Sequence, residues 1–337
     1  LVATTAADNT AVGTLALTAN SSGTDNTAVG YASLDANTTG ADNTAIGDNA
    51  LGANITGSYN TAIGSDALLL NTASENTAVG QGALDANSTG VKNVAMSNGA
   101  LGANTTGDFN TGLGYRALNA NTTADSNTAV GNDALLLNTT GAQNTAVGNT
   151  ALDAVTTASY LTAVGYNALG ANTSGTGNTG VGYSAGGALT TGADNTAVGQ
   201  NALLYVTTAS RNTAIGTASL DASSNAGDDN TAVGYNTLTA NTTGTDNTVV
   251  GSYCMGSNTT GASNTGLGYN TLNANTTASN NTGLGYNALA ANTTGASNVA
   301  VGTLALDANT TADNNTAIGY ESLTTNTTGT ANTGVGR

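Results

Sequence analysis

The chain has 337 residues, a formal net charge of −16 and only four Lys or Arg residues, while His, Trp and Pro are absent. So few cations cannot neutralise a phosphate backbone, which disfavours direct nucleic-acid binding, and no apolar run approaches the roughly 18 residues that insertion into a membrane as a helix requires. Without His, and with Cys254 as the single cysteine, most general-base and nucleophile arrangements are excluded, so we expect no enzymatic activity.

A five-residue motif, Asn-Thr-Ala-Val-Gly or a close variant, recurs from residue 9 to residue 332. Its start advances by 17 residues each time, apart from one step of 16 (60 to 76) and one of 18 (212 to 230). We number each repeat from this Asn as position 1, and the consensus is N-T-A-V-G-Y-N-A-L-x-A-N-T-T-G-x-x. A fixed period of this kind indicates a repeat architecture, and residues 1–337 are predicted to form one continuous array without separate caps.

The positions of the repeat differ in how strictly they are kept. Position 1 is Asn in every repeat except at Leu161, position 4 is always aliphatic, and position 5 is Gly except at Ser97. Position 9 is Leu except at Gly186 and Met255, whereas positions 6, 7, 10, 16 and 17 vary freely. This contrast predicts that the strict positions point inward and the variable ones outward.

These features predict an all-β fold, a parallel β-solenoid (β-roll) with about 20 coils of 17 residues stacked into an elongated rod. A 17-residue unit is too short for a helical repeat, and its Gly, Asn and Thr residues are poor in helix interiors. In the repeat that starts at Asn26, we expect a first strand over residues 27–29, a corner at Gly30, a second strand over residues 33–36, and a corner over residues 37–40 where φ > 0 is needed.

The oligomeric state is predicted from the apolar residues of the expected strands. Adjacent strand residues face opposite sides, and positions 3 and 4, like positions 8 and 9, are both apolar. One face fills the bore and the other is free to meet another chain, which favours a multi-chain fibre, most simply a parallel trimer. The alternative is a single chain with tolerated outward alanines. The missing caps indicate either an excerpt of a longer chain or head-to-tail stacking into a filament.

The Asn at position 1 is the best candidate for a structural column, because stacked Asn side chains form amide ladders. The column contains Asn9, Asn26, Asn43, Asn60, Asn76, Asn93, Asn110, Asn127, Asn144, Asn178, Asn195 and Asn212.

Position 12 creates the Asn-x-Ser/Thr acceptor pattern for N-glycosylation in fourteen repeats. The favoured interpretation is corner chemistry, in which these side chains bond their own backbone, and glycosylation is the alternative. The candidate residues are Asn20, Asn37, Asn54, Asn87, Asn104, Asn121, Asn138, Asn172, Asn241, Asn258, Asn275, Asn292, Asn309 and Asn326.

Two variable positions carry side chains that could bind ligands. Carboxylates recur at position 17, where a column could hold Ca²⁺ weakly, although exposed solubilising charge is the favoured interpretation and no other cofactor is expected. Tyr fills position 6 in eight repeats, where packing beside the Gly corner is the favoured interpretation and binding of glycans or surfaces is the alternative. The acidic residues are Asp8, Asp25, Asp42, Asp194, Asp229 and Asp246, and the tyrosines are Tyr31, Tyr115, Tyr166, Tyr183, Tyr235, Tyr269, Tyr286 and Tyr320.

The motif of residues 26–30 (NTAVG) and of residues 43–47 (NTAIG) resembles the head repeats of YadA-like trimeric autotransporter adhesins. The longer form, residues 281–289 followed by residues 292–295, resembles repeats of tail-fibre-like bacterial and phage surface proteins. The resemblance covers nearly the whole chain and implies a parallel β-roll, often trimeric, on an extracellular fibre. The YadA-like unit is somewhat shorter, which puts the shape of the coil in question.

The favoured function is therefore a structural subunit of an extracellular or surface fibre, located outside the cell or on a cell or virion surface. Its expected partners are further copies of the chain, in multi-chain or end-to-end association, and surface glycans. An adhesin head that binds host or surface glycans is the alternative. An ice-binding solenoid is less favoured, because the paired threonines are adjacent and alternate sides rather than forming Thr-x-Thr.

Overall fold

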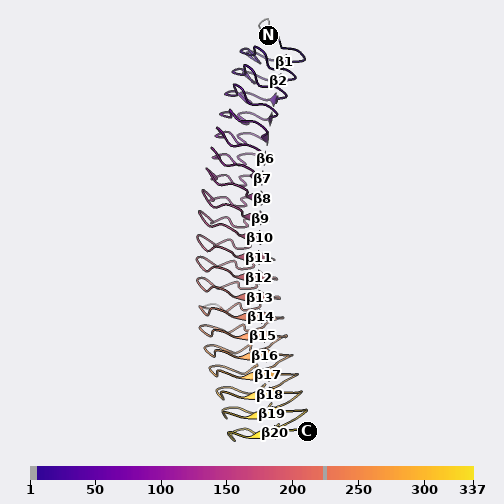
Figure 1. Cartoon of the computed structure of the whole chain (residues 1–337), viewed down its shortest axis with the longest axis vertical. Coiled ribbons are helices and arrows are strands. Elements are labelled where there is room, and N and C mark those ends of the chain that lie inside the picture. Colours follow the sequence, from indigo (N-terminus) through magenta and orange to yellow (C-terminus); the bar gives the residue numbers. More distant parts are fainter. Residues whose placement is uncertain (1–5, 223–225) are drawn as a thin grey trace. The chain divides into compact units, whose positions relative to one another are not determined.

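The computed structural model describes residues 6–222 and 226–337, in which the chain is all-β and forms a parallel β-solenoid with no helix. Contacts divide the chain into two compact units, Leu1–Tyr166 and Asn167–Arg337. The described residues of each unit contain ten three-residue strands, and Figure 1 shows them in chain order. Unit 1 contains β1 (Thr10–Val12), β2 (Thr27–Val29), β3 (Thr44–Ile46), β4 (Thr61–Ile63), β5 (Thr77–Val79), β6 (Val94–Met96), β7 (Thr111–Leu113), β8 (Thr128–Val130), β9 (Thr145–Val147) and β10 (Thr162–Val164). Unit 2 contains β11 (Thr179–Val181), β12 (Thr196–Val198), β13 (Thr213–Ile215), β14 (Thr231–Val233), β15 (Thr248–Val250), β16 (Thr265–Leu267), β17 (Thr282–Leu284), β18 (Val299–Val301), β19 (Thr316–Ile318) and β20 (Thr333–Val335).

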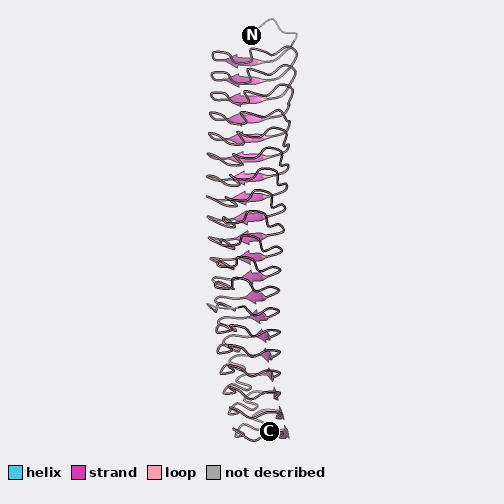
Figure 2. Ribbon diagram, turned by 90° about the vertical axis from the view of Figure 1, so that its left-hand side faces the viewer, coloured by secondary structure: helices cyan, strands magenta, loops and turns pink. Residues whose placement is uncertain are grey.

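Within each unit, every strand pairs in parallel and in register with the strand of the next coil (Figure 2). Thr27, for example, lies opposite Thr44, so equal repeat positions stack in columns. The 16-residue and 18-residue repeats preserve this register, with Thr61 opposite Thr77 and Thr213 opposite Thr231. The irregular residues are therefore absorbed outside the strands, because a slip inside a strand would turn its side chains to the other face.

The interior of each coil is filled by positions 1, 3, 8, 9 and 12. In the coil of β2 these are Asn26, Ala28, Ser33, Leu34 and Asn37, each with an exposed fraction of 0%. One Leu per coil is the largest of these side chains, and the others are small or are amides. A thin coil therefore reaches full burial at few sites, and stability comes from stacking on the neighbouring coils.

The second strand expected at positions 8 to 11 is absent, so that prediction was wrong. These residues form turns, and positions 7 and 9 have left-handed backbone, as at Asn49 (φ 55°) and Leu51 (φ 53°). A strand would point one of two adjacent residues outward, whereas Ala50 and Leu51 are both fully buried. The left-handed residues turn both side chains into the bore, so positions 8 and 9 leave no apolar face for another chain.

Although this segment is not a strand, its backbone still bonds to the next coil. The N–H of Leu51 donates to the carbonyl of Ala67 at 3.1 Å, and the N–H of Ala53 donates to the carbonyl of Leu69 at 2.9 Å. At the corner, the N–H of Thr38 donates to the carbonyl of Ile55 at 2.9 Å. Inter-coil bonds thus follow most of the 17-residue circuit, as buried backbone requires.

Gly occurs at positions 5 and 15 of the repeat for different structural reasons. Gly30 at position 5 has φ 141°, and a Cβ there would lie 2.3 Å from the carbonyl oxygen of Gly47. Gly40 at position 15 has no positive φ, contrary to the expectation for this corner, but its Cβ would lie 2.3 Å from the carbonyl oxygen of Gly57. Ala replaces Gly at position 15 in several coils, such as Ala124, because a close contact can relax more easily than a backbone conformation that only Gly adopts cheaply.

Substitutions of two leucines in one coil test which repeat positions point into the bore and which point outward. Leu289 at position 9 is fully buried, whereas Leu284 at position 4 is 41% exposed. We expect Leu289→Ala to lower the free energy of unfolding by about 2–5 kcal/mol, because it leaves a cavity, and Leu284→Ala to lower it by about 0.5 kcal/mol or less. Urea denaturation followed by circular dichroism measures both, and equal losses would contradict the assignment.

Candidate functional site

The Asn side chains at position 1 form the ladder that the sequence predicts. The Nδ2 of Asn26 donates to the carbonyl of Gly40 in its own coil at 2.9 Å. The Oδ1 of Asn26 accepts the backbone N–H of Asn43 in the next coil at 3.0 Å. Each amide thus closes its own coil and holds the next one. The described candidates of this column are buried, apart from the partly exposed Asn9.

The Asn side chains at position 12 bond the backbone of their own corner, as the sequence predicts, and they also form a second ladder, which was not predicted. The Nδ2 of Asn37 donates to the Oδ1 of Asn20 at 3.1 Å and to the carbonyl of Gly40 at 3.0 Å. That carbonyl also accepts from Asn26, so the two ladders converge on the position-15 carbonyl of each coil. The signal was present in the sequence, because Asn recurs at both positions.

The glycosylation candidates at position 12 are, with one exception, buried in the folded protein. The position-12 side chains are 0–3% exposed, and Asn326 alone among the candidates is partly exposed. Their Nδ2, the atom to which an N-glycan attaches, lies inside the coil, and in most of them it donates to the position-15 carbonyl, as in Asn104 (3.0 Å) and Asn258 (3.0 Å). A bulky glycan there is incompatible with this packing, so these residues act in the coil as structural amides. The buried set is Asn20, Asn37, Asn54, Asn87, Asn104, Asn121, Asn138, Asn172, Asn241, Asn258, Asn275, Asn292 and Asn309.

Interruptions of the second ladder show what it contributes. Val155, Val206 and Leu189 replace the position-12 Asn and are fully buried. The Oδ1 of Asn138, which precedes Val155 in its column, has no hydrogen-bond partner among the described residues. Asn172, whose column continues with Leu189, has no partner for either its Oδ1 or its Nδ2. The coil therefore accepts an apolar side chain here, and a ladder amide is favourable only while its neighbours supply bonds.

The outward face of the strands carries positions 2 and 4. Position 3 points into the bore, as Ala45 does at 0% exposure, whereas Ile46 at position 4 is 39% exposed. The strict position 4 therefore faces outward, which corrects the prediction that strict positions point inward. Among the exposed members at position 4 within the stacks are Met96 (45%), Val164 (38%) and Leu267 (46%).

The composition of this outward face is uniform. Position 2 is Thr in 18 of 20 repeats and Val in the others, and position 4 is aliphatic in all 20. The face has no charged residue, and Thr never replaces Val at position 4, although Thr has a similar shape and a comparable strand preference. Strand preference alone does not explain that exclusion, which indicates that the column must be apolar.

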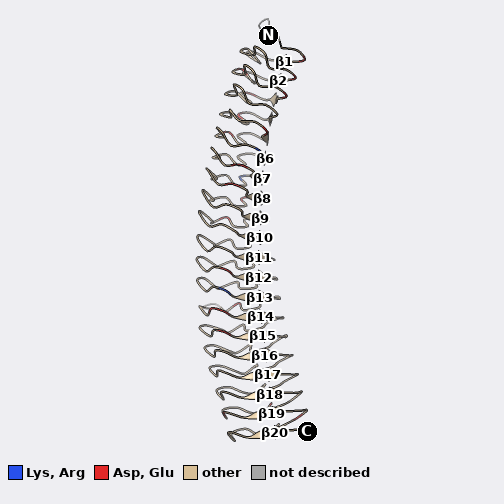
Figure 3. Ribbon diagram, viewed as in Figure 1, with Lys and Arg blue, Asp and Glu red and all other residues tan. Residues whose placement is uncertain are grey.

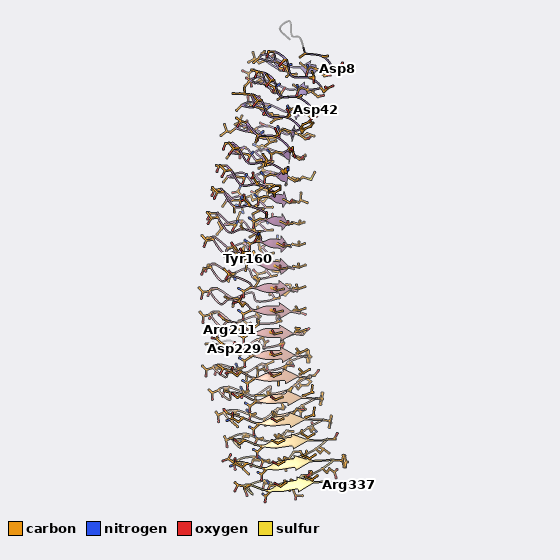
Figure 4. All side chains as sticks on the ribbon, viewed as in Figure 1. Asp8, Asp42, Tyr160, Arg211, Asp229 and Arg337 are labelled. Atoms are coloured by element: carbon orange, nitrogen blue, oxygen red, sulfur yellow. The ribbon has the colours of Figure 1, made fainter. Side chains whose placement is uncertain are left out.

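The carboxylates at position 17 lie on the outside of the coils. Asp8, Asp25, Asp42, Asp194, Asp229 and Asp246 are all exposed. Arg211 donates to Asp229 in the neighbouring coil, with Nε–Oδ1 at 2.6 Å, and lies beside it in Figure 4. The guanidinium lowers the pKa of Asp229. Residues 6–222 and 226–337 contain no group of three or more metal-ligating side chains that could hold an ion.

Charged residues are few and scattered in both units (Figure 3). Lys92 pairs with Glu75 at 3.8 Å and Arg116 pairs with Asp133 at 2.9 Å, in each case across neighbouring coils. These partly exposed pairs contribute little to stability. The single cysteine, Cys254, is buried in the bore, and burial raises the pKa of its thiol to about 12, so it acts as a small apolar filler.

Unit 1 has an open polar groove of about 410 Å³ near β4–β7, lined among others by Asp66, Asp85, Asn98 and Asn119. It forms where glycines such as Gly99 leave space at positions that carry larger side chains in other coils. Burial raises the pKa of Asp85, and the charge of Asp66 contributes to the same shift. Sequence reasoning missed this groove, because its residues come from variable columns.

Comparison with protein-family models, curated proteins and solved structures finds no match to this chain. Over residues 6–222 and 226–337, no helix has the length and apolarity that crossing a bilayer requires.

Two substitutions at position 12 test the energetics of the second ladder. Asn172→Val removes a buried amide without hydrogen bonds and introduces the side chain found at Val155 and Val206, so we expect the free energy of unfolding to rise by about 1–2 kcal/mol. Asn104→Val removes bonds to Asn87 and Gly107, and we expect a loss of about 1–3 kcal/mol. Urea denaturation of both variants is the measurement, and a change of the same sign in both would refute the ladder.

Proposed function

We propose that this protein is a structural subunit of an extracellular or surface fibre, in which copies of the chain associate side by side through the outward face of their strands. The observation that carries the proposal is the outward column at position 4, which is aliphatic in every repeat and is half-buried or exposed in each strand. Exposed apolar surface in a continuous stripe is unusual for a protein that acts alone. A non-enzymatic role agrees with the absence of His and the burial of Cys254.

A second copy is the occupant that this face favours. Because positions 2 and 4 are neutral in all repeats, two such faces meet without burying an unpaired charge. Because equal residues recur in every coil, the faces of two copies can match along their whole length. Ten strands at about 4.8 Å spacing and about 10 Å width give roughly 500 Å² per unit on each partner. The total of roughly 1,000 Å² per pair of units meets the lower limit for a specific interface.

The decisive variants replace valines at position 4 by threonine, which keeps shape and strand preference and adds a hydroxyl. V130T/V147T/V164T in unit 1, combined with V181T/V198T/V233T in unit 2, places six hydroxyls on the face. We expect the wild type to form concentration-dependent oligomers in sedimentation velocity and bundled filaments in negative stain. We expect the variant to dissociate at least about tenfold more readily, because each contact then buries an unpaired hydroxyl.

The matched control makes the opposite change at position 2. T128V/T145V/T162V in unit 1, combined with T179V/T196V/T231V in unit 2, introduces in the same six strands the residue that β6 and β18 already carry at position 2, as Val94 and Val299. This control is expected to associate as strongly as the wild type or more strongly. A wild type that is monomeric at all concentrations would overturn the proposal, and a monomer that produces thermal hysteresis would replace it by ice binding.

A further inference from the structure

Four tyrosines in unit 2 form a continuous aromatic ladder over the consecutive coils of β14–β17. Ring centroids lie 5.5 Å apart for Tyr235 and Tyr253, 5.9 Å for Tyr253 and Tyr269, and 5.6 Å for Tyr269 and Tyr286. The side chains are 39–51% exposed. We refer to Tyr235, Tyr253, Tyr269 and Tyr286 as the Tyr ladder.

The ladder is continuous only because one of its members changes position in the repeat. Tyr235, Tyr269 and Tyr286 occupy position 6, whereas the coil between the first two has Ser252 at position 6 and Tyr253 at position 7. The left-handed backbone of Tyr253 (φ 57°) places its ring in contact with the rings of both neighbours. By contrast, Tyr31 and Tyr115 have no aromatic residue at position 6 or 7 of the adjacent coils.

The ring contacts hold the ladder in place at the surface. Tyr253 meets its neighbours edge to face, with interplanar angles of 85° and 77°, and Tyr269 and Tyr286 are nearly parallel at 9°. Such pairs are favourable beyond the area they bury. Desolvation by the surrounding groups raises the pKa of Tyr253. Rings that are already ordered lose less conformational entropy when a ligand binds.

The charge around the ladder restricts the ligand. Residues 230–297, which comprise these four coils, contain a single charged residue, the carboxylate Asp246 at position 17. A nucleic acid or an acidic polysaccharide would find no cation there, and a basic ligand would find one carboxylate. The surface therefore suits an uncharged ligand that binds by ring contacts and neutral hydrogen bonds.

Amide side chains lie next to the rings in sequence and supply those hydrogen bonds. Asn236, Asn270 and Asn287 occupy position 7, each directly after a Tyr of the ladder, and all three are partly exposed. The Nδ2 of Asn270 donates to the Oδ1 of Asn287 at 2.9 Å. An amide has two donor hydrogens and two acceptor lone pairs, so one such bond leaves capacity for a ligand hydroxyl.

We propose that the Tyr ladder binds an extended, uncharged polysaccharide. A pyranose ring presents both C–H groups and hydroxyls, and the exposed parts of the tyrosine rings, their hydroxyls and the neighbouring amides offer apolar contacts and hydrogen bonds side by side. One aromatic ring per coil, at a spacing near the length of one hexose unit, matches a linear polymer with a repeating unit. A globular protein partner has no such period.

The test uses the full chain and neutral soluble polysaccharides as probes. Affinity electrophoresis through gels that contain hydroxyethylcellulose, xylan, glucomannan or pullulan measures binding. Because the chain has no Trp, its tyrosine fluorescence reports on the rings when the corresponding hexaoses are added. We expect retardation by at least one neutral polymer and none by alginate or heparin, and we expect a change in tyrosine emission on binding.

The binding variant is Y235N/Y253N/Y269N/Y286N, because Asn already occurs at positions 6 and 7 in other coils and therefore preserves the fold. The control, Y31N/Y115N/Y320N, makes the same substitution at position 6 outside the ladder. We expect the ladder variant to bind at least about tenfold more weakly and the control to stay within about twofold of the wild type.

Three results would overturn the proposal. The first is no binding to any neutral polymer, and the second is equal weakening by both variants. The third is a ladder variant that binds polymer as well as the wild type but loses association between copies, which would make the ladder a contact between chains. Circular dichroism of both variants confirms that each retains the solenoid.

Discussion

One backbone carbonyl per coil organises the interior of this solenoid. The carbonyl at position 15 accepts hydrogen bonds from two buried amides, as Gly40 does from Asn26 and Asn37. Each amide also bonds to a neighbouring coil, so the same contact that closes a coil sets its register on the next one. A buried amide without partners is costly, and the two ladders satisfy amides that would otherwise have to face water.

This arrangement explains how a chain with so few large apolar residues fills a bore. A coil with one strand has room for few inward side chains, and one Leu per coil supplies most of the apolar volume. To point inward beside its buried neighbour at position 8, Leu118 adopts left-handed backbone (φ 55°), a conformation that costs roughly 1–2 kcal/mol per residue. Full burial of a Leu side chain contributes about 1.5–3 kcal/mol. Burial is therefore large enough to offset the strain, and Leu is kept where local preference alone would favour Gly or Asn.

The surface of the coil divides into faces under different constraints. The strand face keeps an apolar column in every repeat, whereas the corner at positions 6 and 7 changes from coil to coil. A uniform face suits a partner built from the same repeat, and a locally varied corner suits a ligand that occupies a few coils. The proposed association between copies uses the first, and the proposed polysaccharide binding uses the Tyr ladder of the second. The apolar column and the ladder lie two residues apart in sequence, so assembly and ligand binding are separable by substitution.

The sequence by itself determined the period, the parallel solenoid, the first strand of each coil and the ladder at position 1, because equal residues at a fixed spacing stack whatever the shape of the coil. It did not determine which of Ala45 and Ile46 points inward. Alternation places adjacent strand residues on opposite faces, but both residues are apolar, so either could fill the bore. It also could not place Leu51 beside Ala50 in the bore, or bring Asn37 next to Asn26 at one carbonyl. The first depends on left-handed residues such as Asn49, which break the alternation of a strand. The second depends on where the chain returns, which only the closed coil shows.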